Sequence, residues 1–182
     1  MRQNWNLRDA EGYLRIEYIV GAFLLIRLIG ITNAPLEIAH NWRQVTGLMV
    51  ARNYFEIDPT FWLPRVDETN GLTGIIGMEF PLLNYLHYLV SLVFDYQHWY
   101  GRLINLAVSS VGSYFFYKLI KERLNTKTAY YATIFLLGSI WFMYARKMMP
   151  DTFSMSLGFI GLYFCIRSTF NCFRILIIAG TE

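Results

Sequence analysis

The sequence predicts an all-α, polytopic membrane protein with about four to five transmembrane helices and amphipathic surface helices in a large first outer loop. Hydrophobic residues make up 55% of the 182-residue chain and charged residues only 16%, whereas about a quarter of an average soluble domain is charged. Apolar runs of about fifteen or more residues recur along the chain, and the mean hydropathy is positive. A net charge of +3 is too small to indicate nucleic-acid binding, so we expect the basic residues to set the membrane topology.

The first apolar run begins after a short charged segment. Residues 1–15 contain several arginines and lack a signal-peptide cleavage pattern, so we interpret them as a cytoplasmic flank. Residues 16–33 are the first predicted span. We expect this helix to end before Pro35, because proline disfavours a helical conformation at the residue before it.

Residues 34–100 form a polar, aromatic segment that we predict to be the outer loop. Residues 41–56 have helical periodicity, and the spacing i, i+3, i+4 places His40, Arg43 and Gln44 on one face. Residues 80–95 are apolar but too short for the roughly twenty residues that a span needs, which predicts a second surface helix.

Three further spans are predicted at residues 102–120, 129–145 and 150–168, and a fifth apolar run starts within 172–182. The loop between the predicted spans at 102–120 and 129–145 is rich in lysine and arginine, which marks the cytoplasmic side of the membrane. This loop falls inside only if 80–95 lies on the outer surface rather than across the membrane. The same arrangement brings the outer loop and the Arg146–Asp151 segment to the outer face.

Three residues are candidates for catalysis: Asp151, Glu79 and His40. Pro150 can occupy a first helical position, so Asp151 either caps the helix or presents a carboxylate to an outer pocket. Glu79 is either a solvated loop acid or a catalytic carboxylate. His40 is either a hydrogen-bonded structural residue or a proton acceptor near neutral pH.

Four polar residues are candidates for binding the substrate and its phosphate: Arg43, Gln44, Arg102 and Arg146. The forked donors of a guanidinium match the oxygens of a phosphate, although contact with lipid headgroups is the alternative for each arginine. The two cysteines show neither metal-ligand spacing nor a disulfide framework, so no metal site is predicted.

The order of several short motifs resembles the C-type glycosyltransferase superfamily. Within this superfamily, the sequence is similar to bacterial relatives of the dolichyl-phosphate-mannose protein mannosyltransferases and to the aminoarabinose transferases, which are family 39-type enzymes. The matching positions are His40 to Gln44 with Ala51-Arg52-Asn53, Glu79-Phe80-Pro81-Leu82, Arg102, and Arg146 with Pro150-Asp151. His40-Asn41 stands where many relatives have acidic residues, and Glu79 where they have Lys or His. The catalytic base therefore cannot be assigned from the matching positions alone; we expect Glu79 or His40, with Glu37 and Asp67 as weaker candidates.

The resemblance implies an inverting transfer of a sugar from a polyprenyl- or dolichyl-phosphate donor to a protein, lipid or glycan at the outer face. It implies a multi-pass protein of the bacterial inner membrane, surrounded by lipids, with its site on the periplasmic or extracellular side. Relatives have more spans, so we expect an N-terminal fragment. No cofactor is certain, and a divalent metal stays open because some members need one. The alternatives are a non-catalytic membrane subunit and a transporter or flippase fragment.

Overall fold

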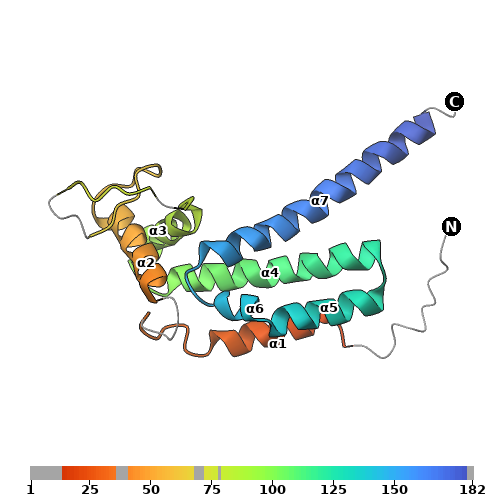
Figure 1. Cartoon of the computed structure of the whole chain (residues 1–182), viewed down its shortest axis with the longest axis horizontal. Coiled ribbons are helices and arrows are strands. Elements are labelled where there is room, and N and C mark those ends of the chain that lie inside the picture. Colours follow the sequence, from red (N-terminus) through yellow and green to blue (C-terminus); the bar gives the residue numbers. More distant parts are fainter. Residues whose placement is uncertain (1–13, 36–40, 68–71, 78, 180–182) are drawn as a thin grey trace.

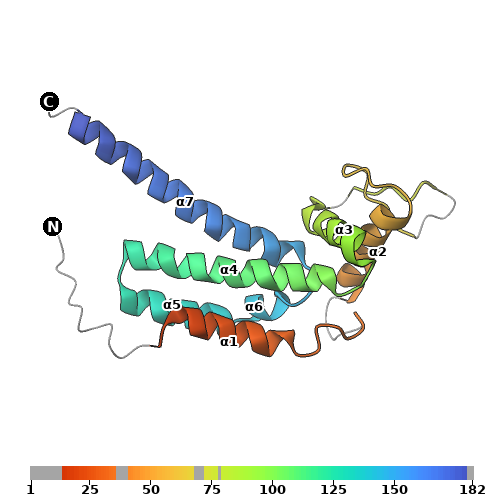
Figure 2. The ribbon, with the colours of Figure 1, turned by 180° about the vertical axis from the view of Figure 1, so that it is seen from behind.

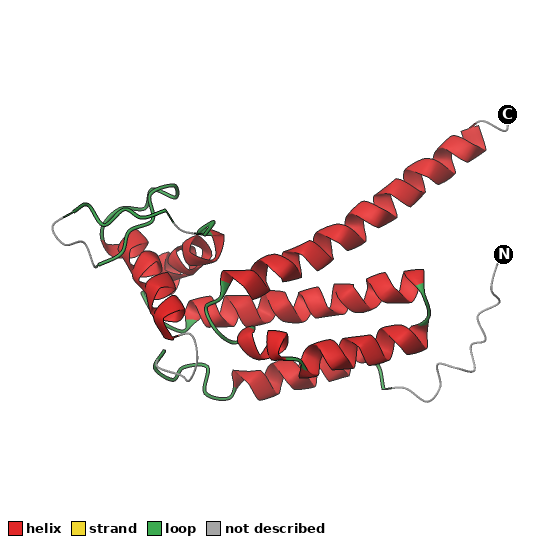
Figure 3. Ribbon diagram, viewed as in Figure 1, coloured by secondary structure: helices red, strands yellow, loops and turns green. Residues whose placement is uncertain are grey.

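The computed structural model describes residues 14–35, 41–67, 72–77 and 79–179, with side chains up to Ser168. This part of the chain is helical and contains no strand (Figure 3), and an isolated antiparallel bridge joins Arg65 and Ile75. The all-α class is therefore confirmed. The helices are α1 (Ile16–Leu28), α2 (Asn41–Glu56), α3 (Leu82–Phe94), α4 (Tyr100–Arg123), α5 (Thr126–Gly138), α6 (Ile140–Tyr144) and α7 (Pro150–Ala179).

Helix α4 is the centre of the molecule, because it contacts α1, α3, α5 and α7. Figures 1 and 2 show α1, α5 and α6 along one side of α4 and the first half of α7 along the other. Helices α2 and α3 pack together at the end where α4 begins. The second half of α7 extends away from the other helices (Figure 1).

Small and polar residues form the interface between α4 and α7. A Cβ atom on Gly112 would lie 2.7 Å from the Cβ of Ser156, so the glycine allows the two backbones to approach closely. Asn105 Nδ2 donates to the carbonyl of Lys147 at 2.7 Å and to Thr152 Oγ1 at 2.8 Å. Small residues such as Gly112 and Ser156 are typical of helix contacts in membranes. The hydrogen bonds of Asn105 fix the turn that leads into α7.

The predicted surface helices correspond closely to α2 and α3, and the predicted span at 102–120 lies within α4. Three helix boundaries differ from the bounds of the predicted spans. The helix predicted at 16–33 ends at Leu28, because the chain turns at Gly30 with φ 73°. The segment 129–145 is divided at Ser139, whose extended backbone separates α5 from α6. No new helix starts at 172, because α7 continues unbroken through Ala179 and the sequence contains no proline or glycine from residue 162 to 179.

By length and composition, one helix in the described part of the chain could cross a membrane, and this helix is α4. Helices α1 and α5 have only 13 residues each, fewer than the roughly twenty residues of a typical span. The number of membrane spans therefore stays a prediction.

Candidate functional site

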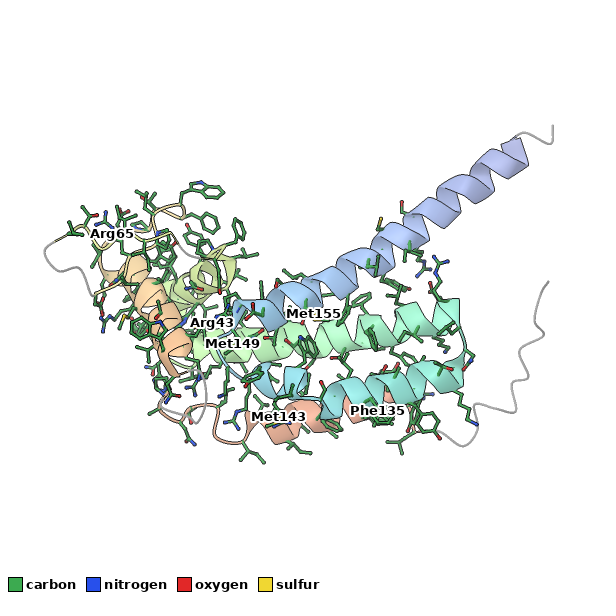
Figure 4. All side chains as sticks on the ribbon, in the orientation of Figure 1. Arg43, Arg65, Phe135, Met143, Met149 and Met155 are labelled. Atoms are coloured by element: carbon green, nitrogen blue, oxygen red, sulfur yellow. The ribbon has the colours of Figure 1, made fainter. Side chains whose placement is uncertain are left out.

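Arg43 joins two carboxylates that are far apart in the sequence. Its guanidinium forms an ion pair with Glu79. It also approaches Asp151 with both terminal nitrogens, Nη1 to Oδ2 at 2.8 Å and Nη2 to Oδ1 at 3.2 Å. All three side chains are partly open to solvent. Figure 4 shows Arg43 on α2 facing the beginning of α7. The structure thus brings together one predicted phosphate-binding residue and two predicted catalytic residues.

The turn before α7 places Asp151. Pro150 begins the helix and Asp151 lies in its first turn, as the sequence predicted. Asn105 of α4 fixes this turn, since its side-chain amide also donates to the carbonyl of Met149 at 3.3 Å. The Asp151 carboxylate therefore projects from a firmly supported helix start, where free backbone amides favour a negative charge.

Glu79 lies just before α3. The N-cap of α3 is Pro81, so Glu79 precedes the helix and is not in its first turn. The adjacent Phe80 packs edge-on against Phe61, with ring centroids 5.4 Å apart. Phe61 also packs on Tyr85 of α3 at 5.0 Å. This aromatic cluster, rather than the helix terminus, positions Glu79 beside Arg43.

A polar network shapes the rest of the loop between α2 and α3. Asn53 of α2 donates to the carbonyl of Arg65 at 3.0 Å and to Asp67 Oδ1 at 3.1 Å. Arg52 pairs with Asp67. Hydrogen bonds from Thr60 lower the pKa of Asp58. Asp67, a reserve candidate for the base, is thus engaged with α2, and Arg43 is not among its described partners.

Two cavities flank the Arg43–Glu79–Asp151 cluster. The first has a volume of about 420 Å³ and is lined by Arg43, Glu79 and the polar side chains of Thr46 and Asn84. The second has a volume of about 440 Å³ and includes Asp151. Its wall is mostly apolar, with Leu82, Leu83, Phe153 and Leu157. Glu79 and Pro150 line both cavities, so the carboxylates lie between the two.

The other two predicted arginines are used differently. Arg102 is buried in α4, and its Nη1 donates to the carbonyls of Ile31 and Asn33 at 3.3 and 2.8 Å. Arg146 Nη2 donates to the carbonyl of Gly30 at 3.2 Å. These bonds fix the turn after α1, and neither arginine lines the two cavities beside Arg43.

Of the remaining predicted residues, Gln44 is fully buried in α2 and lines neither cavity. Its amide oxygen and nitrogen have no hydrogen-bond partner among the described residues. His40 and Glu37 lie outside the described residues. In the part of the chain that the structure describes, no cluster of three or more histidine, cysteine or carboxylate side chains could hold a metal ion.

Residues behind the cavity that Thr46 and Asn84 line were missed by the sequence analysis. Asn84 Nδ2 donates to the carbonyl of Gly47 at 3.1 Å and ties α3 to α2. One turn later, His87 Nε2 donates to the carbonyl of Gln97 at 2.9 Å, and burial lowers the His87 pKa to about 4. The side chain of Met148 lies between Gly47 and Gly101, and the His87 ring also approaches Gly101. The signal in the sequence that could have identified them is the pair of polar residues, Asn84 and His87, three positions apart in an otherwise apolar helix.

Comparison with known proteins places the chain in a family. No curated protein and no solved structure matches the sequence. The family described as dolichyl-phosphate-mannose-protein mannosyltransferase matches residues 79–181, which is more than half of the chain and includes Glu79 and Asp151. Proteins of this family are membrane-embedded, and the family indicates a glycosyltransferase of the C type with a dolichyl-phosphate sugar donor in general. The chain belongs to the dolichyl-phosphate-mannose-protein mannosyltransferase family.

Proposed function

We propose that this chain carries the sugar-transfer site of a multi-span enzyme in the bacterial inner membrane. The enzyme moves a sugar from a polyprenyl- or dolichyl-phosphate donor to a protein, lipid or glycan on the periplasmic or extracellular side. The observation that supports this most strongly is the position of Arg43 between Glu79 and Asp151, where two cavities meet. In this proposal α1, α4, α5 with α6, and α7 cross the membrane, whereas α2 and α3 lie on its outer surface.

The proposed reaction is a single displacement. A hydroxyl or amine of the acceptor attacks the anomeric carbon of the sugar, and the bond between that carbon and the phosphate oxygen breaks. The bonding electrons leave with the lipid phosphate. The acceptor proton passes to a carboxylate, either Glu79 or Asp151, and His40 remains an alternative base. General-base assistance of this kind typically contributes about 10²–10⁴-fold.

Arg43 is proposed to receive the departing phosphate. A guanidinium can exchange a carboxylate partner for a phosphate because both offer paired oxygens in the same plane. Such an exchange would release a carboxylate to accept the proton while the positive charge stabilises the leaving group. Gln44, Arg102 and Arg146 are buried or bound to the backbone, so we propose that they support this region without touching the phosphate.

The experiment measures transfer by the longest natural chain that contains these residues, in membrane vesicles supplied with a radiolabelled polyprenyl-phosphate sugar. Glu79→Gln or Asp151→Asn is expected to lower the rate at least about 10²-fold and to leave the amount of protein in the membrane unchanged. Asp95→Asn is the matched control, because Asp95 is exposed and lines neither cavity. Wild-type rates in both variants would refute the site and favour a non-catalytic subunit.

A further inference from the structure

A third cavity lies at the opposite end of the molecule from Arg43. It has a volume of about 750 Å³ and is formed by the beginning of α1, the end of α4 and the beginning of α5. This volume exceeds that of either cavity at the candidate site and is within the usual range for small-molecule sites. The proposed sugar transfer gives this cavity no role.

Three cations line the cavity, Arg15, Lys118 and Lys121. Among the described residues, none of them forms an ion pair or a hydrogen bond through its side chain. The ammonium groups rest on aromatic rings instead, with Lys118 Nζ 4.8 Å from the centre of the Tyr114 ring and Lys121 Nζ 5.7 Å from that of Tyr117. A contact with a ring face is not a conventional hydrogen bond. The N–H groups of both lysines therefore remain available to donate to an anion.

Two helix starts add to the attraction for an anion. Helix α1 begins at the cavity wall, and its N-cap Arg15 provides no side-chain cap. Helix α5 begins there with Thr126. The Asn125 side chain caps the Thr128 amide of α5 at 2.7 Å. The first turn of α1, which has no side-chain cap, and the positive ends of both helix dipoles therefore favour negative charge.

Two carboxylates oppose this attraction, and removing one of them should therefore have opposite effects on anion and cation binding. Glu17 and Glu122 line the same cavity, and Glu17 forms no ion pair among the described residues. Glu122 accepts a hydrogen bond from Tyr163 at 3.2 Å. An anion in this cavity must tolerate Glu17, so removing that charge should tighten anion binding, whereas it should weaken binding of a cation.

We infer that this cavity binds the phosphate of a membrane-lipid headgroup. The source is assigned from position, because α4 is the candidate membrane helix and the cavity lies at its end. A headgroup lies at the same depth as the end of a membrane-spanning helix. Exposed Leu14 and the tyrosine rings at the cavity provide apolar contact for the glycerol and the start of the acyl chains. The inference does not require that the chain transfers sugar.

The test measures binding of phosphatidylglycerol to the purified chain in detergent by native mass spectrometry. Lys118→Gln with Lys121→Gln is expected to weaken binding about 25-fold, or about fivefold for each lysine. Glu17→Gln is expected to strengthen it several-fold. Lys127→Gln is the matched control, because Lys127 carries the same charge near the same end of the molecule and does not line the cavity.

Circular dichroism of each variant establishes that the helices are intact. Inorganic phosphate is the probe that separates a lipid from a soluble ligand, and it is expected to displace phosphatidylglycerol only weakly. Wild-type affinity in the double lysine variant, weaker binding in Glu17→Gln, or displacement by inorganic phosphate at equal concentration would each overturn the inference.

Discussion

Two arginine-containing regions lie near the end of the molecule where α4 begins, and they differ in what the arginines contact. Arg102 is buried and donates to the carbonyls of Ile31 and Asn33. Arg43 is partly exposed, and its partners are the carboxylates of Glu79 and Asp151 at the edge of two cavities. Both arginines have the side-chain chemistry for binding phosphate.

The difference shows how the partner of an arginine determines what the arginine can do. Backbone carbonyls of a turn cannot leave, so Arg102 is committed to the fold, and its loss leaves the buried carbonyl of Ile31 without this donor. Carboxylates that face solvent can separate from a guanidinium at little cost, because exposed ion pairs contribute little to stability. Arg43 is therefore able to exchange partners, as a phosphate-binding residue in a reaction cycle must.

The largest effect is expected when Arg43 is replaced by methionine. If Arg43 stabilises the departing phosphate, the transfer rate of Arg43→Met falls about 10²–10³-fold. Thermal unfolding in detergent should change by less than about 1 kcal/mol. Arg52→Met is a suitable control, since Arg52 is on the same helix and pairs with Asp67 away from the cavities. Near wild-type transfer by Arg43→Met would mean that the phosphate binds elsewhere.

The reverse pattern is expected for Arg102→Met. Loss of two hydrogen bonds from a buried, charged donor should lower the free energy of unfolding by about 3 kcal/mol. The residual folded protein should retain transfer activity for each molecule in the membrane. The comparison between the two arginines fails if Arg102→Met is as stable as the wild type, or if it folds normally and transfers no sugar.

Acidification should destabilise the region around His87, behind the cavity that Thr46 and Asn84 line. Burial lowers the pKa of His87 to about 4, from 6.5 for an unperturbed histidine. Between these values the unfolded chain binds the proton more strongly than the folded chain. The contribution of His87 to stability is therefore complete above about pH 6.5 and declines as the pH falls towards 4, by up to about 3 kcal/mol.

His87→Gln should flatten this part of the pH profile, measured by unfolding midpoints in detergent between pH 4 and 7. His98→Gln should retain most of the wild-type slope, because burial is the largest cause of the lowered His87 pKa and the charge of His98 is the smallest. An unchanged slope in His87→Gln would assign the acid sensitivity to other groups.

The smallest effect is expected at the interface of α4 and α7. A methyl group on Gly112 would meet both Cα and Cβ of Ser156 within 3 Å. Gly112→Ala should therefore force the helices apart and cost about 1–3 kcal/mol. Gly158→Ala on α7 is the control, because a Cβ atom there meets no atom within 4 Å. A gain in stability for Gly112→Ala would contradict the close approach of these helices.

Much of the helical architecture follows from local sequence signals. Helical periodicity and the short apolar length of 80–95 place α2 and α3 close to their predicted bounds. The end of α1 was missed because it depends on the positive φ of Gly30, and glycine also occurs inside α1, α4 and α7 without ending them. The division at Ser139 has no proline beside it, so the apolar run alone could not predict it.

The candidate site could be predicted only in part. The order of motifs selected Arg43, Glu79 and Asp151, which the structure brings into contact. The same order could not distinguish them from Arg102 and Arg146, because side-chain direction depends on which helices pack together. Asn84, His87 and Met148 were missed for the same reason, since their proximity arises from the packing of separate segments.

The most direct test of the site is the side of the membrane on which its two carboxylates lie. Single cysteines at Glu79, Asp151 and Leu124 would be introduced into a chain with Cys165 and Cys172 replaced by alanine. They would then be labelled with a membrane-impermeant maleimide in intact cells. We predict that Glu79→Cys and Asp151→Cys react from outside, whereas Leu124→Cys reacts only after permeabilisation. If the cysteines at 79 and 151 react from opposite sides, the two carboxylates cannot share one site.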